Sequence, residues 1–238
     1  MIDRYGRDIS YLRLSVTELC NLRCRYCMPA EGVCKQRHEE MLTEDEIIRA
    51  VRAAASLGMY KVRITGGEPL VKPNILSICR RVAEVRGVTE TVLTTNATRL
   101  AALARPLREA GIRRVNISLD TLNAEKYAFM TRGGVLADAI SGIEAALEAG
   151  FEKIKINAVL IGGFNDDEIP ALAALTQRRP VDMRFIELMP CREIPCSASR
   201  PISPSAGCWK CCRRRNPQRI MTGWHGCTGF RAGWAISA

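Results

Sequence analysis

The sequence lacks the apolar segments that membrane insertion and export require. No apolar run approaches the roughly 20 residues that span a bilayer, and residues 1–8 contain no apolar core of a secretory signal. We therefore expect a cytoplasmic protein. Thiols stay reduced in the cytoplasm, so clustered cysteines are expected to bind metal rather than to form disulfides.

Histidine is also scarce, because the chain of 238 residues contains only His38 and His225. Neither lies at the end of a predicted strand. A histidine general base is therefore not expected, and the sequence predicts no catalytic side chain.

Acidic residues are few near the C-terminus, where most of the net charge of +10 arises. From residue 191 onward the chain has seven Arg and one Lys against a single acid, Glu193. The preceding part is close to balanced. A basic groove for nucleic acid is therefore not expected.

The last 48 residues contain no Leu, Val, Asp or Tyr, yet hold six of the eleven Cys and all three Trp. Without Leu and Val this segment lacks the periodic apolar face of a packed element. We predict a core domain over residues 1–190 and an irregular tail over residues 191–238, disordered or produced by a shift of the reading frame near residue 190.

Upstream of the tail, strand and helix patterns alternate. The patterns predict strands at 11–16, 61–65, 89–94, 113–119, 153–160 and 182–188, and helices at 43–57, 73–85, 100–110, 135–149 and 166–177. Six strands with a helix between each successive pair imply parallel strands with right-handed crossovers. The fold class is α/β, a partial (βα)6 TIM-like barrel, with its ligand site at the C-terminal strand ends.

A C-x3-C-x2-C motif, formed by Cys20, Cys24 and Cys27, directly follows the first predicted strand. A closed zinc site takes four ligands, whereas a four-iron cluster held by three thiolates leaves one iron open. The alternative is structural zinc with Cys34 or Cys79 as the fourth ligand. The second predicted strand ends in Gly66-Gly67-Glu68-Pro69, where two glycines allow a close approach of the backbone.

These two motifs, one βα unit apart, resemble the radical S-adenosylmethionine (SAM) enzymes. The resemblance implies that Cys20, Cys24 and Cys27 hold a [4Fe–4S] cluster whose open iron binds SAM. It further implies that the residues contacting SAM are Tyr26, Gly66, Gly67, Glu68, Pro69, Ser118 and Met189.

Three cationic residues, Arg13, Arg63 and Lys155, lie within predicted strands one, two and five. Burying such charges unpaired is costly, and Arg makes bidentate contacts with phosphate oxygens. They predict a phosphorylated substrate. The alternative is that each pairs with an internal carboxylate or reaches solvent.

Longer strings, including Arg184-Phe185-Ile186-Glu187-Leu188-Met189-Pro190, extend the resemblance over about residues 3–190 to GTP 3′,8-cyclases, which begin molybdenum cofactor biosynthesis. The resemblance implies conversion of GTP to (8S)-3′,8-cyclo-7,8-dihydroguanosine 5′-triphosphate, with Arg13, Arg63, Thr94 and Lys155 binding GTP. The implied partners are GTP and an electron donor such as flavodoxin or ferredoxin. Homodimerisation is left open, and neither membrane nor nucleic acid is expected.

The tail departs from that family. A second [4Fe–4S] cluster is expected there, yet Cys208, Cys211 and Cys227 do not reproduce the family's spacing. We expect SAM cleavage to be possible and cyclisation to be impaired. The alternatives are a radical SAM enzyme acting on another small molecule or a peptide, a zinc-binding module, and a non-functional truncated product.

Overall fold

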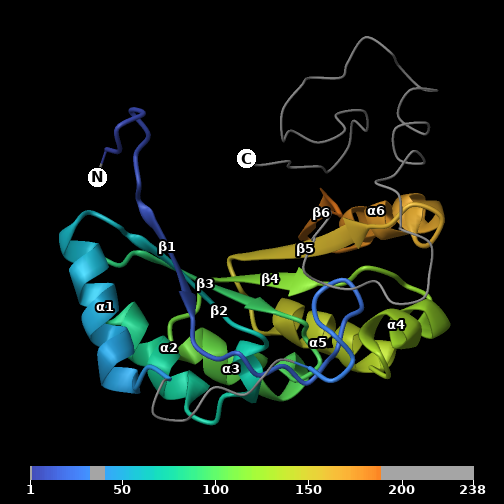
Figure 1. Cartoon of the computed structure of the whole chain (residues 1–238), viewed down its shortest axis with the longest axis horizontal. Helices are drawn as coiled ribbons and strands as arrows, with labels where there is room; N and C mark the ends of the chain where they lie inside the picture. Colours follow the sequence, from blue (N-terminus) through green and yellow to red (C-terminus); the bar gives the residue numbers. More distant parts are fainter. Residues whose placement is uncertain (1, 33–40, 189–238) are drawn as a thin grey trace. The chain divides into compact units, whose positions relative to one another are not determined.

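The computed structural model describes residues 2–32 and 41–188. Within them six strands follow one another in a single sheet in sequence order, with helices alternating between them (Figure 1). The expected parallel α/β arrangement is therefore confirmed. The strands are β1 (Tyr11–Ser15), β2 (Lys61–Thr65), β3 (Glu90–Thr95), β4 (Arg114–Ser118), β5 (Lys153–Leu160) and β6 (Val181–Glu187).

The boundaries of α1 follow local capping chemistry. Helix α1 (Glu44–Ser56) begins at Thr43, whose hydroxyl accepts from the Glu46 amide, while the Glu46 carboxylate accepts from the Thr43 amide at 2.8 Å. This is the capping box that the sequence predicts. Gly58, just beyond the helix, has φ 92°, a left-handed conformation in which glycine carries no steric penalty.

Two predicted helices differ in detail from those observed, and two elements were not predicted from the sequence. Helix α2 (Ile75–Ala83) starts after Pro73, with Asn74 as its N-cap. The predicted helix 166–177 is a 3-10 turn, η3 (Asp166–Glu168), followed by α6 (Ile169–Arg178). The missed elements are α4 (Ala124–Thr131) and the 3-10 turn η2 (Pro69–Val71).

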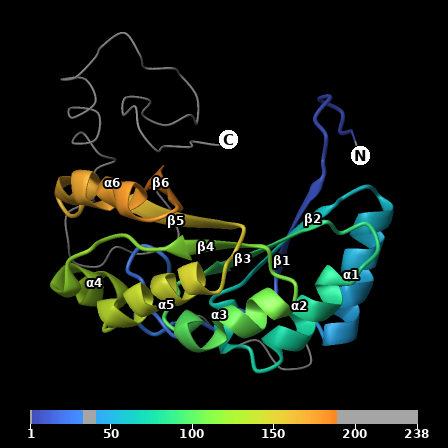
Figure 2. The same ribbon diagram turned by 180° about the vertical axis from the view of Figure 1, so that it is seen from behind.

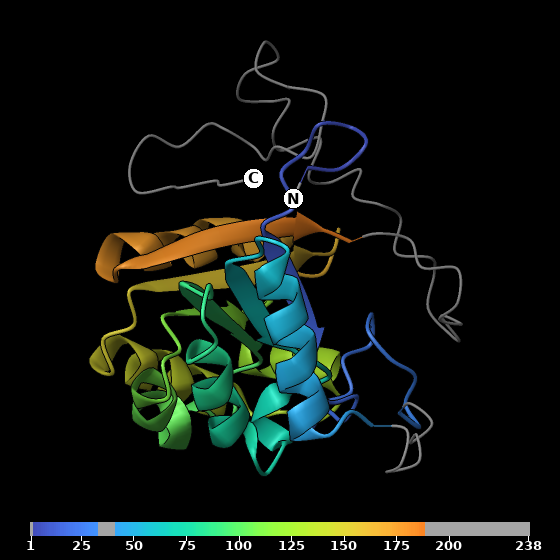
Figure 3. The same cartoon turned by 90° about the vertical axis from the view of Figure 1, so that its left-hand side faces the viewer.

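The chain divides into two compact units. The first contains Met1–Leu22, Glu31–Ile117 and Ala137–Ile154. In it α1, α2, α3 (Leu100–Glu109) and α5 (Leu136–Glu148) lie along one face of β1 to β4 (Figures 2 and 3). The strand residues that alternate onto this covered face are buried, namely Leu14, Val62, Ile64, Leu93, Val115 and Ile117.

The second unit contains Arg23–Ala30, Ser118–Leu136 and the chain from Lys155 onward. It holds α4, most of β5, α6 and β6, together with the segment that carries Cys24 and Cys27. The predicted domain boundary at residue 190 and the predicted tail lie outside the described residues. In the part of the chain that is described, no helix has the length and apolarity to cross a membrane.

Candidate functional site

Cys20 lies in the first unit, in the loop that leaves β1. Its sulfur accepts from the Leu22 amide at 3.4 Å and from the Asn96 side-chain nitrogen at 3.9 Å. N–H donors directed at sulfur stabilise a thiolate and tune a metal bound to it. Asn96 was not predicted as a site residue. The only signal for it in the sequence is its place just after the third strand.

Cys24 and Cys27 lie in the second unit, on a single turn. The Cys24 carbonyl accepts from the Cys27 amide at 2.9 Å and from the Met28 amide at 3.1 Å. Both are reduced thiols, and Cys27 is exposed. Over residues 2–32 and 41–188, no three His, Cys, Asp or Glu side chains form a ready-made metal-binding group.

The two residues considered as a fourth ligand behave differently. Cys79 is completely buried on α2, and burial raises the pKa of its thiol to about 12. A thiol must lose its proton to bind metal, so Cys79 packs as a core residue. Cys34 lies outside the described residues. The ligands on offer within the described part of the motif are therefore the three thiols of residues 20–27.

Tyr26, between Cys24 and Cys27, is held by Asp120. Its hydroxyl donates to Asp120 Oδ2 at 2.8 Å, and Asp120 Oδ1 accepts from the Val159 amide at 2.8 Å. Desolvation, followed by the nearby Asp120 charge, raises the pKa of Tyr26 well above its usual value. Burial likewise raises the pKa of Asp120. This carboxylate, missed in the sequence, fixes the direction of the Tyr26 ring.

The two glycines of the Gly66-Gly67 pair are required by the chain that enters the cysteine loop. A Cβ on Gly66 would lie 2.4 Å from the Thr17 carbonyl oxygen, and one on Gly67 would lie 2.4 Å from that of Glu18. The Gly67 amide also donates to Thr17 at 2.7 Å. The pair therefore allows β2 to approach the backbone that leads to Cys20.

Glu68 is buried at 1% exposure and accepts three hydrogen bonds. Its donors are the Leu70 amide at 3.0 Å, the Thr95 hydroxyl at 2.7 Å and the Asn96 amide at 2.6 Å. Burial raises the pKa of Glu68, and these hydrogen bonds oppose that rise. A carboxylate offers about four lone-pair sites, so one remains for a ligand donor beside the ends of β2 and β3.

The uncovered face of β1 to β4 carries the predicted phosphate contacts. Arg13 on β1 stands in register with Arg63 on β2, so two cationic side chains share one face of neighbouring strands. Like charges opposite one another destabilise a sheet unless an anion or carboxylate separates them. The Arg63 guanidinium also lies 5.0 Å from the centre of the Tyr11 ring.

Thr94 adds a hydrogen-bonding group to this face. It pairs in register with Asn116, and its hydroxyl oxygen is buried without a hydrogen-bond partner. A buried polar atom of that kind is costly when it stays unsatisfied. A ligand oxygen beside it would remove the cost.

Glu90 and Arg114, both missed in the sequence, complete the row of charges. Arg114 is in register with Val92, which is itself in register with Arg63. Glu90 Oε1 lies 2.6 Å from the Lys61 ammonium and 3.1 Å from the Arg114 guanidinium. The carboxylate therefore neutralises the N-terminal end of this face.

The remaining predicted site residues belong to the second unit or lie outside the residues that the structure describes. Ser118 ends β4. Lys155 on β5 lies 4.0 Å from Asp182 on β6, at the limit of an ion pair, so the internal carboxylate considered in the sequence is present. Met189 lies outside the described residues, as do Cys208, Cys211 and Cys227.

The donor set fits the expected cofactors. Three reduced thiols within eight residues suit a cluster that leaves one iron open. Glu68 retains acceptor capacity for an ammonium group beside Asn96, which contacts Cys20. The orphaned hydroxyl of Thr94 and the paired Arg13 and Arg63 suit an anionic ligand.

Comparison with known proteins shows which family this chain resembles. Residues 14–176 match the radical SAM superfamily. The chain is 50% identical over 193 residues to GTP 3′,8-cyclase of Alkaliphilus oremlandii, covering 81% of this chain and 60% of that protein. It is 54% identical over 190 residues to GTP 3′,8-cyclase of Pelotomaculum thermopropionicum, covering 80% and 58%. The chain thus spans about 60% of the length of these relatives.

Solved structures agree on the fold. Methylornithine synthase superposes with a TM-score of 0.64 at 17% identity, over 82% of this chain and 58% of that chain. Streptococcus suis SuiB bound to S-adenosylmethionine superposes with a TM-score of 0.63 at 21% identity, over 78% and 42%. The chain therefore belongs to the radical SAM superfamily, whose enzymes use a [4Fe–4S] cluster and S-adenosylmethionine.

Proposed function

We propose that this chain is a radical SAM enzyme acting on GTP, of the GTP 3′,8-cyclase type in molybdenum cofactor biosynthesis. The observation that carries the proposal is the in-register pair Arg13 and Arg63 on a strand face that also presents the unsatisfied Thr94 hydroxyl. Support also comes from relatives of that name at 50% and 54% identity.

In this proposal Cys20, Cys24 and Cys27 hold the cluster, and Tyr26, Gly66, Gly67, Glu68, Pro69, Ser118 and Met189 surround SAM. Together the cluster and SAM supply the one-electron chemistry that begins with hydrogen abstraction from the substrate. Glu68, dry and fixed by three donors, accepts from the SAM ammonium group with its remaining lone pair.

The chain's own contribution to the substrate is charge and orientation. Arg13 and Arg63 meet phosphate oxygens, where guanidinium groups make paired hydrogen bonds, and Thr94 and Lys155 make the remaining contacts with GTP. The distance between Lys155 and Asp182, 4.0 Å, leaves the ammonium able to exchange its carboxylate partner for a phosphate oxygen. None of these residues acts as a general base.

Cyclisation to the 3′,8-cyclic nucleotide needs the guanine held as well as the triphosphate. The cysteine spacing of residues 191–238 does not match the ligands of the second cluster that serves this purpose in the resembling family. We therefore propose that this chain cleaves SAM and binds GTP, while its cyclisation rate is severely reduced. We further propose a cytoplasmic protein that receives electrons from a flavodoxin or ferredoxin, with a homodimer as the assembly to test.

Nucleotide binding by the full chain tests the substrate assignment without relying on turnover. Titration calorimetry should rank GTP above GDP and GDP above guanosine. Arg63→Ala should weaken GTP binding by roughly tenfold to a hundredfold, because a charged hydrogen-bond pair is lost. Arg49→Ala, at an exposed arginine on α1, is the matched control. Equal affinity for GTP and guanosine would refute a triphosphate site.

A further inference from the structure

The segment that carries Cys24 and Cys27 is built onto the C-terminal end of α4. The Arg23 amide donates to the Thr131 carbonyl at 3.0 Å, and the Arg25 amide donates to the Met130 carbonyl at 2.9 Å. The last carbonyls of a helix have no partner within it. Here the cysteine segment supplies those partners, so the end of α4 acts as its template.

Arg132, the next residue, is in an unusual conformation. It caps α4 with φ 57° and ψ 55°, the left-handed region that favours glycine. Gly133 and Gly134 follow immediately, so the sequence holds glycine within one residue of this cap. A bulky residue in such a conformation usually has a use for its side chain.

The side chain of Arg132 bridges the cysteine segment. One guanidinium nitrogen, Nη1, donates to the Arg23 carbonyl at 2.6 Å and to the Met28 carbonyl at 2.9 Å. These two carbonyls stand immediately before Cys24 and immediately after Cys27. A single nitrogen therefore fixes the separation of the two ends of the turn that bears both thiols.

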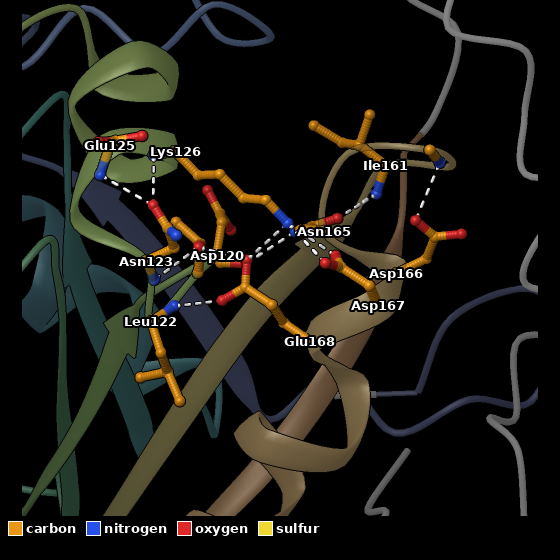
Figure 4. Close-up of polar contacts among 12 residues, drawn as sticks. Asp120, Leu122, Asn123, Glu125, Lys126, Ile161, Asn165, Asp166, Asp167 and Glu168 are labelled. Carbon is orange, nitrogen blue, oxygen red and sulfur yellow. Dashed lines mark hydrogen bonds and ion pairs between the residues drawn. The ribbon is translucent and has the colours of Figure 1, made fainter.

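We call the Arg132 side chain, with its two hydrogen bonds to the cysteine segment, the clamp. The helix that carries it is held at its N-terminal end as well (Figure 4). Asn123 caps the helix by accepting from the Glu125 and Lys126 amides at 2.9 and 3.0 Å. The Lys126 ammonium lies 2.7 Å from Asp167 and 3.1 Å from Glu168. These contacts tie the first turn of α4 to the η3 segment.

We propose that Arg132 is a positioning residue for the metal cluster, holding Cys24 and Cys27 in ligand-ready geometry before iron arrives. The inference rests on the proposed assignment of these thiols as cluster ligands. It adds a residue outside the cysteine motif, 105 residues along the chain from Cys27, on which assembly of the cluster depends.

The substitution Arg132→Gly distinguishes the effect of losing the side chain from the effect of backbone strain. Glycine relieves the left-handed cap while deleting both bridging hydrogen bonds, so a loss of function cannot come from strain. Arg132→Lys keeps the charge but loses the planar fork of donors, and should behave as an intermediate. Arg49→Ala on α1 serves again as the surface-arginine control.

Two measurements decide the proposal. In the chain before reconstitution, hydrogen exchange of the peptide containing the Arg23 and Arg25 amides should be at least about tenfold faster in Arg132→Gly than in the original protein. After anaerobic reconstitution, its iron and sulfide content should fall by about half or more. Millimolar guanidinium ion should restore iron binding, whereas methylammonium should not.

Unchanged exchange and unchanged iron in Arg132→Gly would overturn the proposal. Faster exchange throughout α6 and β6 in Arg132→Gly would mean that this variant has lost its fold. In that case Arg132→Lys decides the question. Faster exchange confined to its cysteine segment would support the clamp, and unchanged exchange in that segment would refute it. If the original protein binds no iron, the cluster assignment fails, while the exchange experiment still judges the clamp by itself.

Discussion

At the scale of single residues, Glu68 joins the ends of two parallel strands. Its carboxylate accepts from Thr95 at the end of β3 and from Asn96 just after it, as well as from Leu70 on its own turn. A carboxylate suits this position because three donors converge on two oxygens. The same carboxylate is the proposed hydrogen-bond acceptor for the SAM ammonium group, so one side chain has both a structural and a functional role.

Replacing Glu68 by Gln should lower the free energy of unfolding by about 2 kcal/mol at neutral pH. The amide has only one acceptor oxygen, so one buried donor loses its partner. Chemical denaturation at pH 7 is the measurement. Glu68→Asp, which keeps both oxygens but shortens the reach, provides a comparison, and stability equal to that of the original protein in Glu68→Gln would contradict the three-donor description.

The pH dependence follows from the direction of the pKa shift. Burial raises the pKa of Glu68 in the folded chain, so the folded state binds the proton more tightly than the unfolded state. The contribution of Glu68 protonation to the free energy of unfolding is therefore fully present below the pKa of the unfolded chain and is lost as pH rises through the pKa of the folded chain. Denaturation curves measured between pH 4 and 8 should show this decline in the free energy of unfolding. The decline should be smaller in Glu68→Gln. Asp120, whose pKa is also raised, contributes in the same direction.

The Gly67 position is limited by space. Gly67→Ala would place a Cβ 2.4 Å from the Glu18 carbonyl oxygen and 2.5 Å from that of Leu19. We expect a loss of about 3 kcal/mol in unfolding free energy, or displacement of the loop segment that leads to Cys20. Gly163→Ala is the control, since its Cβ meets nothing within 4 Å and it is strained only by φ +74°; a loss of about 1 kcal/mol is expected there.

At the scale of elements, α4 depends on its cap. Asn123→Ala removes the side-chain oxygen that accepts from two amides at the start of the helix and should lower stability by about 1 kcal/mol. Thermal unfolding measures this, and Asn123→Asp, which retains a capping oxygen, should stay close to the original protein. An equal loss in both variants would show that the cap is not responsible.

Elements with strong periodicity could be predicted from the sequence, and α4 could not. The capping box of α1 and strands β2 and β5 were correctly placed because alternation and caps are local signals. Helix α4 has only eight residues and buries just Tyr127, Met130 and Thr131, so it shows no extended apolar stripe. Its position is set by contacts distant in sequence, chiefly Lys126 with Asp167 and Glu168.

The candidate site shows the same division. Cysteine spacing and the glycine pair are readable in the sequence because the chemistry lies in adjacent residues. The partners Asn96, Asp120 and Arg132 lie 76, 94 and 109 residues along the chain from the residues they contact, Cys20, Tyr26 and Arg23, so only folding brings them there. Predictions for the SAM and GTP contacts remain predictions.

At the scale of the whole molecule, an anion should stabilise the fold. Tripolyphosphate, a guest that lacks a base and a ribose, should raise the melting temperature more than phosphate or chloride at equal ionic strength. At a hundredfold excess over its dissociation constant it would add about 2.7 kcal/mol. Arg13→Ala combined with Arg63→Ala should abolish the effect, and an identical rise in that double variant would point to nonspecific screening.

The position of Glu90 gives the strand face of the first unit a direction. Its carboxylate lies at the N-terminal end, between Lys61 and Arg114, whereas Arg13 and Arg63 stand two residues further along their strands. Because Glu90 is paired with Lys61 and Arg114, an approaching polyanion is attracted less at this end of the face than in the middle, beside Arg13 and Arg63. A guest with one charged and one neutral end would accordingly place its charged end beside Arg13 and Arg63. The sheet would thus position the charged end of its guest before any base-specific contact is made.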